Sequence, residues 1–256
     1  MNQKIQRLVI VSGICLSLFA CKSKEKSTEP ATTDTSTTEK TAPAPDNTVK
    51  DAVTAAPNQY KVLKDTMGIS VIEADYQPGD STAMHSHHDY AVFSADGATA
   101  TFYGQDGKSM ESVMAPGTFL IRGGEVHSVK NTGKKAFKVI MVEVNRPNKP
   151  MTWDQSLDAT KVAPNLYKLA KDTLGLRAIK VSYKPGQSSP MHAHPDVVLY
   201  VLDGSTAEFT EKDGSKRTAE LTKGMVLIVP ADTHSVKNTG KTTMKGIMVE
   251  VNRSVN

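Results

Sequence analysis

The sequence predicts an all-β protein in which one fold occurs twice. Beyond residue 50, strand-like segments follow one another, and no long stretch has the period of a helix. Residues 127–134 and 234–241 both have the sequence HSVKNTGK, and residues 140–146 and 247–253 both have the sequence IMVEVNR. Because both pairs are separated by the same distance along the chain, they indicate two structural units of one kind. The N-terminal residues differ in composition and are predicted to lie outside these units.

Residues 1–20 have the pattern of an export signal. Lys4 and Arg7 form a short positive region, and residues 8–20 are an apolar run too short to span a bilayer comfortably. The run ends in LFAC, which resembles a bacterial lipobox. That resemblance implies that Cys21 is lipidated, with a palmitate-type anchor, and becomes the mature N-terminus. An ordinary cleaved signal and an uncleaved membrane anchor are the alternatives.

Residues 21–50 are expected to form a disordered tether. They consist mainly of Thr, Lys, Glu, Ser, Pro and Ala, which bury too little apolar surface to offset the entropy of ordering. A flexible chain of this length has a reach of roughly 30 Å. Lys22 follows the cysteine directly, which by resemblance to enterobacterial lipoproteins indicates the outer membrane, facing periplasm or surface. The protein is therefore expected to be exported from a bacterial cytoplasm and anchored in the cell envelope.

The repeated units are predicted at residues 51–147 and 158–256, joined by a linker at 148–157. Within them, residues 140–144 alternate between apolar and other side chains, and residues 197–202 (VVLYVL) form a continuous apolar run of buried-strand length. Asp-Gly pairs separate several of these segments and favour tight hairpins, because glycine accepts a positive φ without strain. The Asp-Gly pairs are Asp96-Gly97, Asp106-Gly107, Asp203-Gly204 and Asp213-Gly214.

Six of the seven histidines fall into two matched sets, each a His-x-His pair and a distant third histidine. Alternate residues of a strand point to the same face, so the paired imidazoles can share a ligand with the third one. Neutral imidazole suits Fe, Zn, Mn, Ni or Cu, and the alternative is histidines that only pack or face solvent. The predicted metal ligands are His85, His87 and His127 in the first unit, and His192, His194 and His234 in the second.

These histidines lie in segments that resemble the motifs of the cupin superfamily. Residues 79–87 and 186–194 match its first motif, in which a glycine stands six residues before His-x-His. Residues 117–131 and 224–238 match its second motif, although Gly123 replaces the expected proline in the first copy. The resemblance implies a bicupin: two tandem double-stranded β-helix (jelly-roll) barrels, each with a divalent transition metal ion in its mouth.

One departure from the cupin pattern concerns the metal ligands. Many cupins add a glutamate ligand a few residues after His-x-His, but Tyr90 and Val197 occupy that place here. The resemblance then points to cupins that bind metal through three histidines alone, as in some dioxygenases. Such a neutral ligand set leaves the ion its full charge and open positions.

Four carboxylates near the histidines are candidates for supporting roles. Asp89 and Asp196 continue the alternation from His-x-His, so either could be a displaced ligand. Glu125 and Asp232 stand two residues before the third histidine and could accept a hydrogen bond from an imidazole. For all four the alternative is an ordinary carboxylate of a surface loop.

Composition narrows the functions further. With 31 Lys and Arg against 27 Asp and Glu, the chain has too little net charge to indicate a nucleic-acid partner, and two cysteines exclude a disulfide-dense scaffold. Three functions remain: a metal-dependent dioxygenase or isomerase acting on a small organic molecule, a metal-binding or ligand-binding lipoprotein, and a structural cupin. No catalytic residue can be named, and a homodimer is left open.

Overall fold

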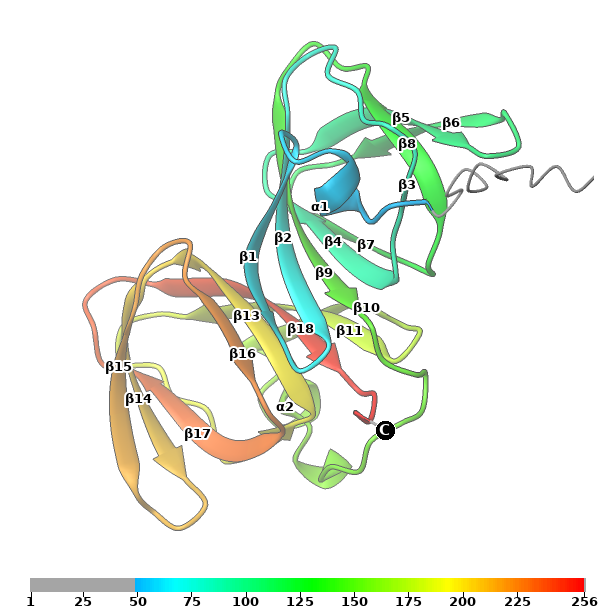
Figure 1. The fold of residues 1–256 in the computed structure, drawn as a ribbon. Coiled ribbons are helices and arrows are strands. Elements are labelled where there is room, and N and C mark those ends of the chain that lie inside the picture. Colours follow the sequence, from blue (N-terminus) through cyan, green and yellow to red (C-terminus); the bar gives the residue numbers. More distant parts are fainter. Residues whose placement is uncertain (1–48, 256) are drawn as a thin grey trace, which may run out of the picture. The chain divides into compact units, whose positions relative to one another are not determined.

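The computed structural model describes residues 49–255, so the signal, Cys21 and nearly all of the tether lie outside the described residues. The all-β prediction is confirmed, and the only helices in the described chain are single turns. Two four-residue helices, α1 (Ala52–Ala55) and α2 (Ala159–Val162), stand at matching places of the two copies (Figure 1). A short 3-10 helix, η1 (Gln155–Leu157), lies in the predicted linker.

The first half folds into two antiparallel sheets, with strand orders β1-β2-β9-β4-β7 and β3-β8-β5-β6 (Figure 1). Consecutive strands repeatedly change sheet, as a jelly roll requires. The strands are β1 (Tyr60–Thr66), β2 (Ile69–Tyr76), β3 (His85–Ser86), β4 (Asp89–Ser94), β5 (Ala98–Gly104), β6 (Ser109–Met114), β7 (Thr118–Arg122), β8 (Val126–Asn131) and β9 (Phe137–Val144).

The second half repeats this topology strand for strand, with orders β10-β11-β18-β13-β16 and β12-β17-β14-β15. The apolar run at residues 197–202 lies within β13, as the sequence predicts. The strands are β10 (Tyr167–Thr173), β11 (Leu176–Tyr183), β12 (His192–His194), β13 (Asp196–Asp203), β14 (Ser205–Glu211), β15 (Lys216–Leu221), β16 (Val226–Val229), β17 (Asp232–Asn238) and β18 (Met244–Val251).

The Asp-Gly pairs have two different roles. Gly107 (φ +75°) and Gly214 (φ +85°) stand in the hairpins β5–β6 and β14–β15, as expected. The pairs at Gly97 and Gly204 instead join strands of opposite sheets, so the hairpin prediction is wrong there. Gly204 is required for space, because a Cβ there would lie 2.3 Å from the carbonyl oxygen of Leu221.

The central strands of the five-stranded sheets, such as β9 and β18, are buried on both faces, which explains their nearly continuous apolar sequences. In β9, Val139 and Met141 pack inside the first barrel, whereas Ile140 and Val142 join a second cluster. That second cluster contains residues of both halves, including Leu176 and others from β11, β13 and β18. The two halves therefore share one apolar core in addition to the interior of each barrel.

Reciprocal ion pairs also connect the two halves. Arg146 donates to Asp196 Oδ2 (2.7 Å) and Arg253 donates to Asp89 Oδ2 (2.6 Å). Each arginine also donates to the other's main-chain carbonyl oxygen, at 3.0 and 3.2 Å. Because both arginine side chains are almost fully buried, these contacts fix the ends of β9 and β18.

Within residues 49–255, no helix has the length and apolar character needed to cross a bilayer.

Candidate metal centres

Antiparallel pairing brings each predicted histidine set together. His85 in β3 pairs with His127 in β8, and His192 in β12 pairs with His234 in β17. Partners in an antiparallel pair share a face, and the second histidine of His-x-His follows on the same face. In each set one ring nitrogen from every histidine lies within 4.8 Å of the others. These two groups, His85–His87–His127 and His192–His194–His234, are called the first and second tripod below.

Hydrogen bonds fix how the first tripod presents its nitrogen atoms. The Nδ1 atom of His85 lies 2.8 Å from the Ala83 carbonyl oxygen, and that of His87 lies 3.3 Å from Glu143 Oε1. His127 Nδ1 lies 3.4 Å from Glu125 Oε1 but forms no hydrogen bond. Carbonyl and carboxylate oxygens only accept hydrogen bonds, so the Nδ1 atoms of His85 and His87 carry the proton and their Nε2 atoms keep the lone pair.

The second tripod has the same arrangement, and its two contacts to carboxylates are shorter than those of the first. The Nδ1 atom of His192 lies 2.9 Å from the Pro190 carbonyl oxygen, and that of His234 lies 3.0 Å from Asp232 Oδ2. His194 Nδ1 lies 2.6 Å from Glu250 Oε1. The predicted supporting carboxylate Asp232 therefore contacts an imidazole of its own half, as Glu125 does in the first half.

Two buried Nε2 atoms of the tripods have no partner, and this is the observation that fits a metal ion best. His87 Nε2 and His194 Nε2 are both inaccessible to solvent and make no hydrogen bond. An unpaired buried polar atom costs about 1–3 kcal/mol, which a bound cation would offset. Imidazoles with Nδ1–H held by an acceptor and Nε2 free are the usual form of histidine ligands in metal sites.

Burial also keeps three of the tripod histidines neutral. Together with the neighbouring imidazoles of His87 and His127, it lowers the pKa of His85 to about 4. Burial lowers the pKa of His192 and of His194 to about 3. Neutral imidazole is the form that binds metal, so these three side chains are ready to act as ligands at neutral pH.

A buried tyrosine stands beside each tripod, and the sequence reasoning missed both. Tyr60 Oη lies 3.2 Å from His85 Nε2 and Tyr167 Oη lies 2.9 Å from His192 Nε2. Each receives a hydrogen bond of 2.8 Å from a second tyrosine, Tyr76 or Tyr183. Burial raises the pKa of Tyr60 and Tyr167 well above the usual value, so both hydroxyls stay protonated and donate towards the tripod. The only signal in the sequence was their retention in both copies.

Glu143 and Glu250 were also missed. They occupy the same place in the two IMVEVNR segments, where a charged side chain in an apolar strand was the available signal. Both accept from a tripod histidine, but Glu250 also accepts from Arg177 Nη1 at 2.6 Å. Ser70 stands at the place of Arg177 in the first half. The two tripods therefore differ in the charge that stands behind one imidazole.

The structure places Asp89 and Asp196 away from the tripods. Besides its arginine of the other half, Asp89 accepts a hydrogen bond from the main-chain N–H of Gly124, and Asp196 accepts one from that of Ala231. Neither belongs to a group of potential metal ligands among the described residues. These two carboxylates therefore position loops and join the halves. Asp232, by contrast, belongs to a further group of potential metal ligands, together with Glu211 and His234.

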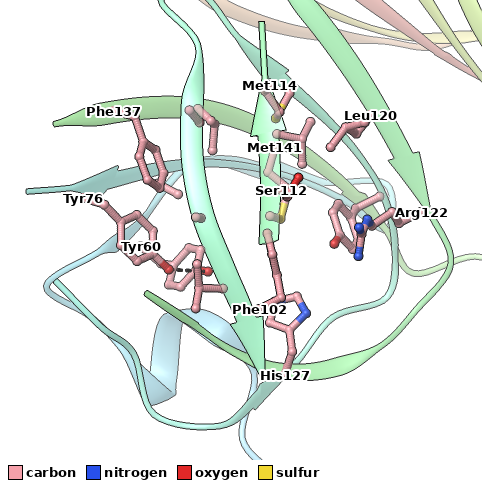
Figure 2. A pocket seen from close by; sticks show the side chains of 17 residues that line it. Tyr60, Tyr76, Phe102, Ser112, Met114, Leu120, Arg122, His127, Phe137 and Met141 are labelled. Atoms are coloured by element: carbon pink, nitrogen blue, oxygen red, sulfur yellow. Dashed lines mark hydrogen bonds between the residues drawn. The ribbon is translucent and has the colours of Figure 1, made fainter. Parts of the chain in front are cut away.

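Each barrel contains a cavity next to its tripod. The cavity of the first half has a volume of about 60 Å³ and is reached by His127, Phe102 and Tyr60 (Figure 2). The cavity of the second half has a volume of about 280 Å³ and is reached by His194 and His234. Both are lined mainly by apolar side chains, so each tripod stands at the polar end of an apolar space.

Comparison with protein families agrees with this architecture. Residues 179–250, most of the second half, match the family model described as "Cupin domain". The fold is a cupin fold. No curated protein sequence matches the chain.

Several solved structures share the fold at low sequence identity. Oxalate decarboxylase from Bacillus subtilis is 14% identical, with 76% of this chain and 72% of that chain covered and a TM-score of 0.52. Another structure of that enzyme, described for its Mn(II) centres, has a TM-score of 0.50, with 14% identity, 73% of this chain and 70% of that chain. AerE from Microcystis aeruginosa is 12% identical, with 75% of this chain and 91% of that chain covered and a TM-score of 0.55.

Proposed function

We propose that this chain is a metal-binding bicupin of the bacterial cell envelope that holds one divalent ion in each tripod and acts on a small organic molecule. The observation that carries the proposal is the pair of buried, unpartnered Nε2 atoms of His87 and His194, in rings whose Nδ1 atoms are held by carboxylates. The ion would be Fe, Zn, Mn, Ni or Cu, since imidazole suits all of these.

A bound ion would supply Lewis-acid or redox chemistry at its open positions. The chain itself contributes three things in the second half. Glu250 holds the His194 ring in place, and Tyr167 presents a protonated hydroxyl at the tripod. The apolar lining of the cavity excludes water from the remaining space. These features favour a reaction in which one oxygen-bearing group of a substrate is oriented at the ion, as in a dioxygenase or an isomerase.

A non-enzymatic ligand-binding lipoprotein is the second candidate. The observation that favours it is that two carboxylates near the second tripod, Glu250 and Asp232, already contact imidazoles. Neither of these two carboxylates is therefore a ready general base. Turnover of small diols, dicarbonyls or phenols by the iron-loaded protein, measured as O₂ uptake, would separate the two candidates.

Oxalate itself is a weak candidate as a substrate. It gives the Bacillus subtilis enzyme its name, but it consists of two carboxylates without apolar surface. The second cavity has an apolar lining, in which an additional unpaired carboxylate would be costly. The likeness to that enzyme therefore concerns the fold.

Metal analysis of the full-length protein tests the metal proposal. We expect two divalent ions per chain, and one ion fewer in each of His85→Ala and His192→Ala. His88→Ala is the matched control, because His88 is exposed and belongs to neither tripod. Wild-type protein without stoichiometric metal, or unchanged metal content in both tripod variants, would contradict the proposal.

Membrane anchoring is tested separately. Cells fed a clickable palmitate analogue should label the wild-type chain and Cys15→Ala, which removes a cysteine inside the signal. Cys21→Ala should abolish the label. Equal labelling of Cys21→Ala would contradict a lipid anchor at that residue.

A further inference from the structure

The two tripods stand beside cavities of very different size, although the two halves share one topology. The cavity volume is about 60 Å³ in the first half and about 280 Å³ in the second. An engineered cavity of about 150 Å³ is known to hold benzene. The first cavity is thus too small for an organic ligand, whereas the second has room for a substituted ring.

Two large exchanges of single residues contribute to the difference. Tyr90, Arg122 and Phe137 line the first cavity, and Val197, Val229 and Met244 stand at the matching places of the second. The exchanges at Tyr90 and Arg122 each put a much larger side chain in the first half. Because the strands have the same arrangement in both halves, the larger side chains of the first half fill the interior of its barrel instead of expanding it.

The closing side chains of the first half are held in place by one another. Tyr90 donates a short hydrogen bond to Glu125 Oε1, and its ring centroid lies 5.1 Å from that of His87. Arg122 Nη1 donates to the same Oε1 atom at 3.2 Å and lies over the Phe102 ring. Figure 2 shows Arg122, Phe102 and His127 around this side of the cavity. Tyr90 is only 3% exposed, so it would not be displaced cheaply.

The second cavity combines an apolar body with polar groups in a few places. Leu199, Leu227 and Met248 are typical of its apolar lining. The polar groups that reach it include the two tripod histidines, Tyr167 and Asp232. Arg217 also lines it, 4.0 Å above the Phe209 ring, with its Nε donating to Glu211. A cavity of this kind fits a ligand with an apolar ring or branched chain and one anionic oxygen group.

We propose that the two centres have diverged: the second is the ligand-binding site, and the first is a closed site that binds no organic ligand. The ligand class is a small aromatic or branched molecule with a single carboxylate or phenolate directed at the second tripod. Val197 is the specificity-determining residue, because its counterpart Tyr90 fills the same place in the closed half. The proposal rests on the proposed function in that the anionic group is placed at the metal.

The internal duplication provides the variants that test this. Val197→Tyr and Met244→Phe each introduce the residue that stands at the matching place of the first half, and Tyr90→Val introduces the second-half residue into the first half. Val113→Tyr is the matched control, since it adds a tyrosine at a side chain that is 71% exposed. The probe is 4-fluorobenzoate, observed by ¹⁹F NMR with the zinc-loaded full-length protein in lipid nanodiscs. Fluoroacetate serves as the probe with the same charged group and no apolar body.

We expect one 4-fluorobenzoate per chain and much weaker binding of fluoroacetate. Val197→Tyr should weaken 4-fluorobenzoate binding by about tenfold or more, because overfilling a packed space costs about 1–3 kcal/mol. Met244→Phe should weaken it less, and Val113→Tyr should leave it unchanged. Tyr90→Val should still bind one 4-fluorobenzoate per chain, and binding of a second 4-fluorobenzoate would further support the proposal.

Three results would overturn the proposal: no 4-fluorobenzoate bound, binding at wild-type affinity in Val197→Tyr, or weakened binding in Tyr90→Val. Zinc is counted on the same samples. Protein that binds the probe in the second half but holds no zinc would refute the metal proposal alone. Protein that holds two zinc ions but fails the probe test would refute the divergence alone.

Discussion

Replacing Arg177 by serine, the residue at the same place in the first half, should strongly destabilise the protein. The Arg177 side chain is 9% exposed and donates to Glu250 at 2.6 Å and to Asp158 at 3.0 Å. The Glu250 side chain is fully buried, and the Asp158 side chain is 7% exposed. Without the arginine, two buried carboxylates lose their cation.

Removing one partner of a buried ion pair costs about 3–5 kcal/mol, because the remaining charge is left uncompensated. Thr160 continues to donate to Asp158 from its main-chain N–H and hydroxyl, so most of the loss should come from Glu250. Burial already raises the pKa of Glu250 to about 7 with the arginine present. Adding Glu250→Gln to Arg177→Ser should therefore recover part of the lost stability by removing the charge.

Urea unfolding of the metal-free protein, followed by circular dichroism, measures these free energies without a contribution from metal binding. Lys161→Ala is the control: its ammonium lies 4.0 Å from Asp158 but its side chain is 66% exposed, so the loss should stay below about 1 kcal/mol. An Arg177→Ser loss as small as that of Lys161→Ala would refute the reasoning. So would a double variant less stable than Arg177→Ser.

Three further predictions concern packing and the contacts between the halves. Gly204→Ala should destabilise by about 1–3 kcal/mol in thermal unfolding, because its Cβ would meet a carbonyl oxygen at 2.3 Å. Leu176→Ala should cost about 2–5 kcal/mol in urea, whereas Val62→Ala, at a 41% exposed residue, should change stability by less than about 0.5 kcal/mol. Arg253→Ala should cost about 2–3 kcal/mol, below the value for a fully buried pair, since its Asp89 partner is 26% exposed. A neutral result in any of the three would contradict the contact concerned.

The sequence was sufficient for the parts of the site that follow from strand geometry. His-x-His on one strand and a third histidine 107 residues from its copy predicted two groupings, and pairing of β3 with β8 and β12 with β17 brings them together. Glu143 and Glu250 could not be assigned in the same way. A glutamate in an alternating strand normally faces solvent. Only the three-dimensional packing shows that Glu143 and Glu250 each contact a histidine from another strand.

The same limit applies to the roles of Asp89 and Asp196. Alternation along the strand correctly relates each to its His-x-His pair, but their partners Arg253 and Arg146 come from the other half. The difference between Tyr90 and Val197 was visible in the sequence as the absence of a glutamate ligand. Its consequence for cavity volume depends on side chains from several other strands, which periodicity alone does not bring together.

X-ray absorption spectroscopy at the zinc edge of the zinc-loaded protein tests the central claim most directly. The account predicts three imidazole nitrogens per zinc ion at about 2.0–2.1 Å, with the remaining position filled by a light atom. Because His85→Ala and His192→Ala each remove one site, the spectrum of the remaining ion should keep its three imidazoles in both variants. A zinc shell made of oxygen atoms, or one with a single imidazole, would contradict the assignment of both tripods.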